Sequence, residues 1–441
     1  MNNHKVGWRI LVFLGIVFIM TGHFVSIPKF QFPEDSEFCF TGMLAAGILN
    51  LDTKDLHGFG MNRISCDGVV YKDKNITTAY DEPEGNSSLY FAFNCLEFAD
   101  HDVQIIPFRK QQLGLQGWFM YYLGRSYSIL HLPPKAYYYF ARGFCAFLFA
   151  LVITIVCYEL HKAYNELMAL CFYCACFCSV WIIDFASNLY FVPFTWFLPM
   201  MFGLMAMNNP DRMIYLCPLV FISVALKALC GYEHITCVMM CSVVFSASEF
   251  LSCLKTNRLR SMLMFKVSLY IGFSALAGFL GGLALHAYVR SGGSILEGLE
   301  EIYRADVVRS TFGRKGNYFV NMLVVIAKMF LGRPVGWAAL GLLIMSYMSS
   351  RDALRRGFDV KGDVILSGLS FISSISWLVL AVGHSVQGVI INYPIWYMPF
   401  IPAALYVFLK QRILVLVPEQ EKRDIFLNSP LELLRRILWL S

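Results

Sequence analysis

The amino-acid sequence predicts an all-α polytopic membrane protein with about ten transmembrane helices and a large first extracytoplasmic loop. Hydrophobic residues make up 57% of the 441 residues and charged residues 15%, against about 45–50% and about 25% in soluble domains. Apolar segments of membrane-spanning length recur along the chain. The lysines and arginines between them fall on alternate connections, as the positive-inside rule requires.

The first element is an amino-terminal transmembrane anchor within residues 1–28. Its apolar run covers residues 8–27, which is longer than the ~7–15-residue core of a signal peptide. No clear small-x-small cleavage site follows this run. We therefore expect an uncleaved anchor, with Lys5 and Arg9 on the cytoplasmic side.

A large loop and a multi-helix domain follow the anchor. Residues 29–136 form the predicted extracytoplasmic loop, and residues 137–410 form the transmembrane domain, which includes a second outer loop at 289–317. The predicted spans are 137–158, 167–187, 189–207, 213–229, 234–254, 263–288, 335–348, 364–383 and 394–409. The short segment 335–348 borrows from the apolar stretch 318–331.

Positive charge sets the orientation. Connections rich in lysine and arginine alternate onto the side of Lys5 and Arg9, whereas the short turns near Asn188, Gly231 and Gly383 carry none. Both termini are therefore predicted to be cytoplasmic, in the cell inner (plasma) membrane. Residues 411–441 form a cytoplasmic tail whose last segment has an apolar helical face, typical of a helix lying on the lipid surface.

An acidic cluster directly follows the anchor. Glu34, Asp35 and Glu37 stand at the membrane boundary, ahead of the long outer loop. Carboxylates in this position suit proton transfer to or from a substrate at the membrane surface. The alternative is a solvated loop start without chemistry.

Several other polar groups are predicted on the same outer side. Glu233 and His234 lie in the turn between two spans, and His384 and Asn392 lie between the last two. Ionisable groups at membrane depth are costly and usually face a cavity or a partner. A shared outer site explains them, although each also has a structural alternative: self-pairing at the interface, a local hydrogen bond or, for the loop arginines, contact with lipid headgroups. Lys227 either extends outward or pairs with Glu233.

Cysteines and known motifs indicate little further chemistry. The cysteines of residues 171–178 scatter around an apolar helix without histidine or carboxylate, so we interpret them as packing residues. In the outer loop we prefer a Cys66–Cys95 disulfide, which leaves Cys39 free. No ATP-binding or dinucleotide-binding motif is present. The net charge of +6 reports membrane orientation and does not indicate a nucleic-acid partner.

Two short motifs carry a family resemblance. The stretch Pro33-Glu34-Asp35-Ser36-Glu37-Phe38 is similar to the acidic motif of the first outer loop in GT-C glycosyltransferases. Leu113-Gly-Leu-Gln-Gly117 resembles the membrane-proximal end of that loop in bacterial members. The layout of anchor, long first outer loop and later helices also resembles this superfamily.

The resemblance implies transfer of a sugar from a polyprenyl-phosphate donor to a glycan or lipid-linked acceptor on the extracytoplasmic face. It implies a catalytic carboxylate, with Asp35 first and Glu37 and Glu34 as alternatives, because Ser36 interrupts the acidic pair. A divalent metal at Asp35 and Glu37 is a weaker implication, and no other cofactor is expected. The remaining predicted substrate-binding residues, which include groups suited to the leaving phosphate, are Arg304, Arg309, Glu233, His234, His384, Gln116 and Asn392.

Three other functions remain open. An O-antigen-type polysaccharide polymerase also uses lipid-linked sugars, but those proteins carry their large arginine-bearing outer loops later in the chain. A lipid-linked-sugar transporter or flippase would be expected to show internal repeats and broken helices, and no convincing repeat is found. A membrane scaffold without catalysis leaves the polar outer cluster unexplained.

Overall fold

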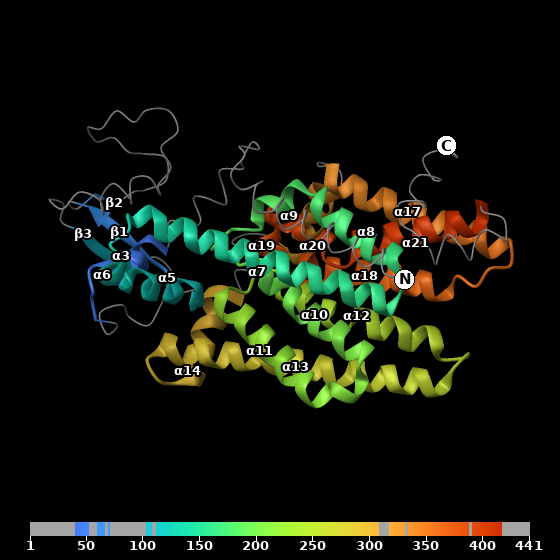
Figure 1. Ribbon diagram of the computed structural model, residues 1–441, viewed down its shortest axis with the longest axis horizontal. Helices are drawn as coiled ribbons and strands as arrows, with labels where there is room; N and C mark the ends of the chain where they lie inside the picture. Colours follow the sequence, from blue (N-terminus) through green and yellow to red (C-terminus); the bar gives the residue numbers. More distant parts are fainter. Residues whose placement is uncertain are drawn as a thin grey trace.

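The structure is a computed structural model that describes residues 40–52, 60–66, 69–70, 103–107, 112–307, 317–330, 334–387 and 390–416. It shows a long bundle of helices with a smaller unit at one end, at the left of Figure 1. We call this the loop end. Features predicted elsewhere lie outside the described residues: the anchor, the acidic cluster 34–37, Cys39, Cys95, Arg309 and the carboxy-terminal helix.

The helices have the length and composition expected of a membrane protein. Within the described residues, five helices are long and apolar enough to cross a bilayer, or six if one sharply bent pair counts as one span. The five are α7 (Pro134–Ala163), α11 with its preceding 3-10 turn (Pro210–Cys230), α12 (Ile235–Cys253), α13 (Arg258–Ser291) and α18 (Lys361–Leu380). All five coincide with predicted spans. The total of about ten stays a prediction.

Three other predicted spans are interrupted. The segment 167–187 divides into α8 (Glu166–Phe177) and α9 (Val180–Phe185), because Ser179 caps a new helix by accepting a hydrogen bond from the Ile182 amide at 3.2 Å. The segment 189–207 becomes helical only at α10 (Phe194–Asn208). The segment 394–409 divides into α20 (Pro394–Tyr397) and α21 (Phe400–Leu416).

The bent pair consists of α16 (Tyr318–Phe330) and α17 (Pro334–Arg355), which meet at 86°. The apolar stretch before the predicted span 335–348 is therefore not a straight continuation of it. The α16 helix instead packs against α19 (Val382–Gln387), and Tyr318 donates a hydrogen bond to the Val379 carbonyl at 2.7 Å.

The loop end adds a small antiparallel sheet to a chain predicted to be all-α. Its strands β1 (Asn62–Cys66), β2 (Val69–Val70) and β3 (Val103–Pro107) lie in the order β2-β1-β3, with Asn62 opposite Pro107. Pairing satisfies the backbone groups of segments that are not helical. The sheet belongs to the predicted first outer loop, so the transmembrane domain remains helical.

Two helices connect this sheet to the bundle. The helix α3 (Thr41–Ile48) is buried almost throughout and packs against α5 (Leu115–Arg125). Tyr121 of α5 donates a hydrogen bond to the Leu51 carbonyl at 2.8 Å, just beyond α3. The short helix α6 (Tyr127–Leu130) then leads into α7. The described part of the predicted outer loop is thus folded against the end of the bundle (Figure 1).

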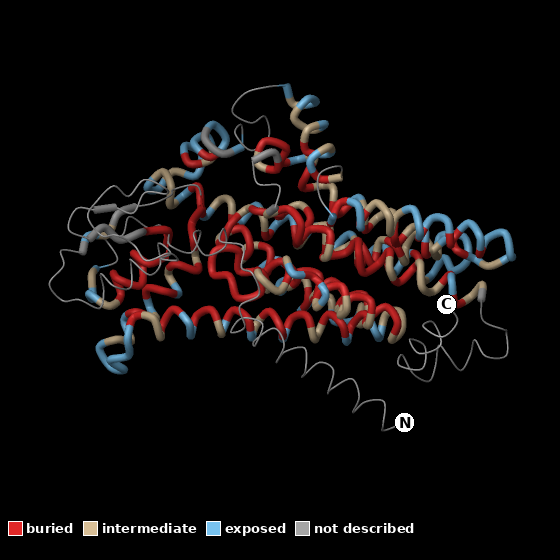
Figure 2. The backbone as a smooth tube through the Cα atoms, turned by 90° about the horizontal axis from the view of Figure 1, so that it is seen from above, coloured by how far each residue is buried: buried red, intermediate tan, exposed pale blue. Residues whose placement is uncertain are grey.

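The bundle core is continuous along its length. The main contacts join α11 to α13, α12 to α13, α12 to α18, and α7 to α10. Figure 2 shows buried segments along the centre and exposed segments on the outlying helices. One of these outlying elements is α14 (Ile295–Ile302), which is followed by a π-helical segment, Tyr303–Val307.

Candidate functional site

The α11–α12 turn at the loop end holds a buried ion pair. Lys227 is 1% exposed and Glu233 is 6% exposed. The Lys227 ammonium donates a hydrogen bond to the Gly231 carbonyl at 2.7 Å and lies 3.9 Å from Glu233 Oε2. A buried charge needs a nearby counter-charge. The burial of Lys227 therefore depends on Glu233, and the burial of Glu233 depends on Lys227.

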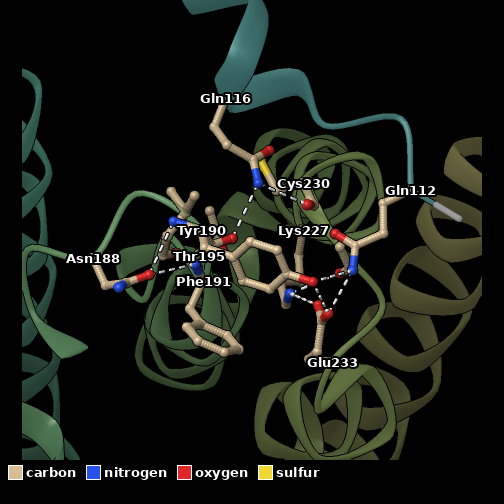
Figure 3. Close-up of polar contacts among 11 residues, drawn as sticks. Gln112, Gln116, Asn188, Tyr190, Phe191, Thr195, Lys227, Cys230 and Glu233 are labelled. Atoms are coloured by element: carbon tan, nitrogen blue, oxygen red, sulfur yellow. Dashed lines mark hydrogen bonds and ion pairs between the residues drawn. The ribbon is translucent and has the colours of Figure 1, made fainter. Parts of the chain in front are cut away.

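Gln112 attaches the chain entering α5 to this pair. Its amide Nε2 donates hydrogen bonds to Glu233 Oε1 and, at 3.1 Å, to the Tyr190 hydroxyl. The Tyr190 hydroxyl in turn approaches Glu233 Oε1 at 3.4 Å. These three side chains come from three segments that are distant in sequence, as Figure 3 shows.

Gln116, four residues further along the chain, makes a second attachment. Its Nε2 donates hydrogen bonds to the carbonyls of Tyr190 and Cys230, each at 3.0 Å. The Gly114 amide donates to the Leu229 carbonyl at 3.1 Å. The start of α5 is therefore bound both to the end of α11 and to the loop before α10. We call Gln112, Gln116, Tyr190, Lys227 and Glu233 the glutamine–lysine cluster.

Glycines explain why α5 can begin in this position. Gly114 precedes the helix with φ = +69°, a conformation that suits glycine. A Cβ on Gly117 would collide with the backbone carbonyl of Gly60, whose amide donates to the Leu113 carbonyl at 2.9 Å. The Leu113–Gly117 motif therefore packs closely against the backbone of Gly60. The same packing directs Gln116 into the cluster.

The loop before α10 holds Tyr190 in place. Asn188 is buried, and its Oδ1 accepts hydrogen bonds from the Tyr190 amide at 2.9 Å and the Phe191 amide at 3.0 Å. This side-chain turn replaces helical hydrogen bonds, which explains why the predicted helix from residue 189 starts later.

His234 adjoins the cluster on its other side. It is fully buried and has φ = +63°, an uncommon conformation for a residue other than glycine. Its ring packs edge-to-face between Trp196 and Trp377, with centroids 5.1 and 5.6 Å away. Burial holds the pKa of His234 well below its ordinary value, and the charges of Lys227 and His384 act in the same direction. The imidazole is therefore neutral near pH 7.

Trp377 connects His234 to two other predicted site residues. Its indole Nε1 donates a hydrogen bond to Asn392 Oδ1 at 2.9 Å. The ring of His384, which lies on α19, has its centroid 5.6 Å from that of the Trp377 ring. Asn392 is fully buried. We call His234, Trp377, His384 and Asn392 the histidine–tryptophan cluster.

Five predicted site residues therefore fall into two adjacent groups. Gln116 and Glu233 belong to the glutamine–lysine cluster, and His234, His384 and Asn392 belong to the histidine–tryptophan cluster. The peptide bond between Glu233 and His234 joins the groups. Asp35, Glu37, Glu34 and Arg309 lie outside the described residues.

Arg304 lies outside both clusters. Its side chain is 76% exposed and pairs with Glu300, one turn earlier in the chain. A charged side chain next to a carboxylate of its own helix and in contact with solvent needs no buried partner. Among the described residues, Arg304 therefore lies apart from the other predicted substrate-binding residues.

Sequence reasoning missed four residues. Gln112 and Tyr190 carry no motif of their own, and Gln112 lies ahead of α5, which begins at Leu115. Trp377 lies inside an apolar span and carries no motif either. Arg142 was detectable as a single cation inside an apolar span. It is buried in α7 and donates hydrogen bonds to the Tyr138 hydroxyl at 3.0 Å and Ser187 Oγ at 3.3 Å.

In the part of the chain that the structure describes, no group of three His, Cys, Asp or Glu side chains is arranged to bind a metal ion. The predicted pair Asp35 and Glu37 lies outside that part. Comparison with known proteins gives no family model, no curated protein and no solved structure that matches the chain.

Proposed function

We propose that this protein is an integral membrane glycosyltransferase that moves a sugar from a polyprenyl-phosphate donor to a glycan or lipid-linked acceptor. The reaction takes place on the extracytoplasmic face of the inner membrane, with both termini cytoplasmic. The observation that carries the proposal is the pair of buried polar clusters at the loop end of an apolar bundle. Such groups are expensive in a membrane protein and are a sign of function.

The position of Phe40 supports the proposal. Its ring packs against Tyr190 of the glutamine–lysine cluster, with centroids 6.2 Å apart. Phe40 comes three residues after Glu37 and five after Asp35 in the sequence. Phe40 is the first residue that the structure describes, so the described chain begins beside the glutamine–lysine cluster, at the point that follows the acidic motif in the sequence.

The chemistry divides between acid–base and phosphate-binding groups. Asp35 or Glu37 accepts the proton of the acceptor hydroxyl as its oxygen forms a bond to the anomeric carbon. The bond from that carbon to the phosphate oxygen breaks, and polyprenyl phosphate leaves with the electron pair. His234 and His384 are suited to donate hydrogen bonds to the leaving phosphate, and Arg309 or Arg304 would supply positive charge.

A substitution pair tests the proposal in cells. In a strain lacking the native gene, Asp35→Asn and Glu37→Gln are compared with the unmodified protein, with Asp211→Asn as the control because Asp211 is exposed on the turn before α11. We expect loss of one surface-glycan modification for at least one variant, at unchanged protein level in the membrane. Full modification in both variants and in their combination would show that neither carboxylate acts as the base.

A further inference from the structure

The amide groups of Gln112 and Gln116 have fixed orientations. Gln112 Nε2 faces a carboxylate oxygen of Glu233, which can only accept a hydrogen bond. Gln116 Nε2 faces two backbone carbonyls, which also only accept. Flipping either amide would set oxygen against oxygen. Both side-chain oxygens must therefore point away from these partners.

Three buried acceptor atoms in the cluster have no hydrogen-bond donor among the described residues. They are Gln112 Oε1, Gln116 Oε1 and Glu233 Oε2. All three side chains are more than nine-tenths buried. A buried acceptor without a donor is costly, typically ~1–3 kcal/mol and more when charged. Two of them border the same point, because a Cβ on Gly231 would overlap Glu233 Oε2 and lie 2.8 Å from Gln112 Oε1.

The spacing of the ion pair differs from that of a second lysine–carboxylate pair in the bundle. Near the start of α18, Lys410 Nζ contacts Asp363 Oδ1 directly at 2.7 Å, and Gln411 also donates to Asp363. Lys227 and Glu233 remain 3.9 Å apart, too far for a direct hydrogen bond. One oxygen atom at about 2.8 Å from both groups would bridge them.

We propose that Gln112 Oε1, Gln116 Oε1, Glu233 Oε2 and the Lys227 ammonium form a subsite for the hydroxyl groups of a saccharide. The assignment deepens the proposed sugar transfer and rests on it. A hydroxyl group can donate to Glu233 and accept from Lys227 at the same time. Donation by further hydroxyls would satisfy the two glutamine oxygens.

Other ligand classes fit these groups less well. A phosphate oxygen would be repelled by Glu233 and, when ionised, has no hydrogen to donate to the glutamine oxygens. A metal cation would find three oxygen ligands, but the Lys227 ammonium near Glu233 would repel it. A polyhydroxylated ring supplies donors and acceptors in one uncharged molecule. The subsite therefore suits an uncharged molecule with several hydroxyl groups better than a phosphate or a metal cation.

Direct binding of simple glycosides tests the subsite without relying on transfer. The full-length protein in lipid nanodiscs is titrated with the methyl glycosides of glucose, galactose, mannose, rhamnose and N-acetylglucosamine, and binding is followed by saturation-transfer-difference NMR. We expect binding of at least one glycoside. For at least two hydroxyl positions of that glycoside, the analogue that lacks the hydroxyl group should bind at least ten-fold more weakly. Absence of binding by the whole set overturns the proposal.

A matched pair of variants assigns the binding to this cluster. Glu233→Gln and Asp363→Asn make the same carboxylate-to-amide change at a buried carboxylate that contacts a lysine and a glutamine, at opposite ends of the bundle. We expect Glu233→Gln to weaken glycoside binding at least ten-fold and Asp363→Asn to leave it unchanged. Equal effects overturn the proposal, as does binding of Mg²⁺ or Mn²⁺ that Glu233→Gln abolishes. If Glu233→Gln does not fold, the deoxy series on the unmodified protein still shows whether the protein recognises individual hydroxyl groups of a saccharide.

Binding and transfer fail separately in this design. Glycoside binding that depends on Glu233, together with no sugar transfer by the same preparation, supports the subsite and contradicts the transferase. Sugar transfer with equal glycoside binding by the two variants supports the transferase and contradicts the subsite.

Discussion

The Lys227 ammonium lies 2.7 Å from the Gly231 carbonyl and 3.9 Å from Glu233 Oε2, so the two charges of the α11–α12 turn face each other without a direct hydrogen bond. The backbone holds the ammonium, and Gln112 holds the other carboxylate oxygen. This arrangement joins the predicted outer loop to the helical bundle. The buried charges of Lys227 and Glu233 thus lie where the α11–α12 turn meets the chain that enters α5.

Removing one charge of this pair should destabilise the protein strongly. Lys227→Met leaves Glu233 buried without its counter-charge, which typically costs about 3–5 kcal/mol. The double variant Lys227→Met/Glu233→Leu removes both charges and should recover part of that loss. Thermal unfolding in detergent compares the two with Lys255→Met, an exposed lysine after α12. A single variant as stable as the Lys255 control would show that the pair is not a coupled unit.

The close contact at Gly117 should tolerate no side chain. In Gly117→Ala the new methyl group meets the backbone oxygen of Gly60, which cannot move away as a flexible side chain could. We expect a loss of about 1–3 kcal/mol or more in stability, and release of the loop end from the bundle. Gly143→Ala on α7 is the control, because nothing lies within 4 Å of that position. Limited proteolysis between α3 and α5 measures the release, and equal protection of both variants would contradict the assignment.

His234 should make stability depend on pH. Its folded pKa is below the ordinary value of about 6.5, so its contribution is complete above that pH and is lost as the pH falls toward the folded pKa. The groups that oppose its protonation are Lys227 and His384, in addition to burial. Between pH 7.5 and pH 5 the free energy of unfolding should fall more for the unmodified protein than for His234→Asn, by up to about 1.4 kcal/mol per pH unit. Asparagine suits the positive φ, so the backbone is retained. Parallel curves for the two proteins would exclude this role.

The long spans could be predicted because composition alone determines them. The helices α7, α11, α12, α13 and α18 are continuous apolar segments, and each begins and ends within a few residues of its predicted position. The breaks depend on local hydrogen bonds instead. Ser179 and Asn188 redirect the chain through side-chain contacts with backbone amides, and neither changes the hydropathy of its segment.

The candidate site was predicted in part for a similar reason. Glu233, His234, His384 and Asn392 are polar residues in apolar surroundings, so their positions alone mark them. Gln112 is different: it bonds Tyr190 and Glu233, which are 78 and 121 residues away in the sequence. Such contacts come from how the loop end packs on the bundle, and a single sequence carries no pattern that shows them.

The most direct measurement of the central proposal is donor turnover by the purified protein. Liposomes containing the protein and polyprenyl-phosphate hexoses or pentoses, labelled in the sugar, are incubated with an extract of the cell's lipid-linked glycans. The account predicts transfer of label to an acceptor and release of polyprenyl phosphate by the unmodified protein, with loss of both in Asp35→Asn or Glu37→Gln. Label that remains on every donor, or that merely crosses the bilayer still attached to its lipid, would contradict the account.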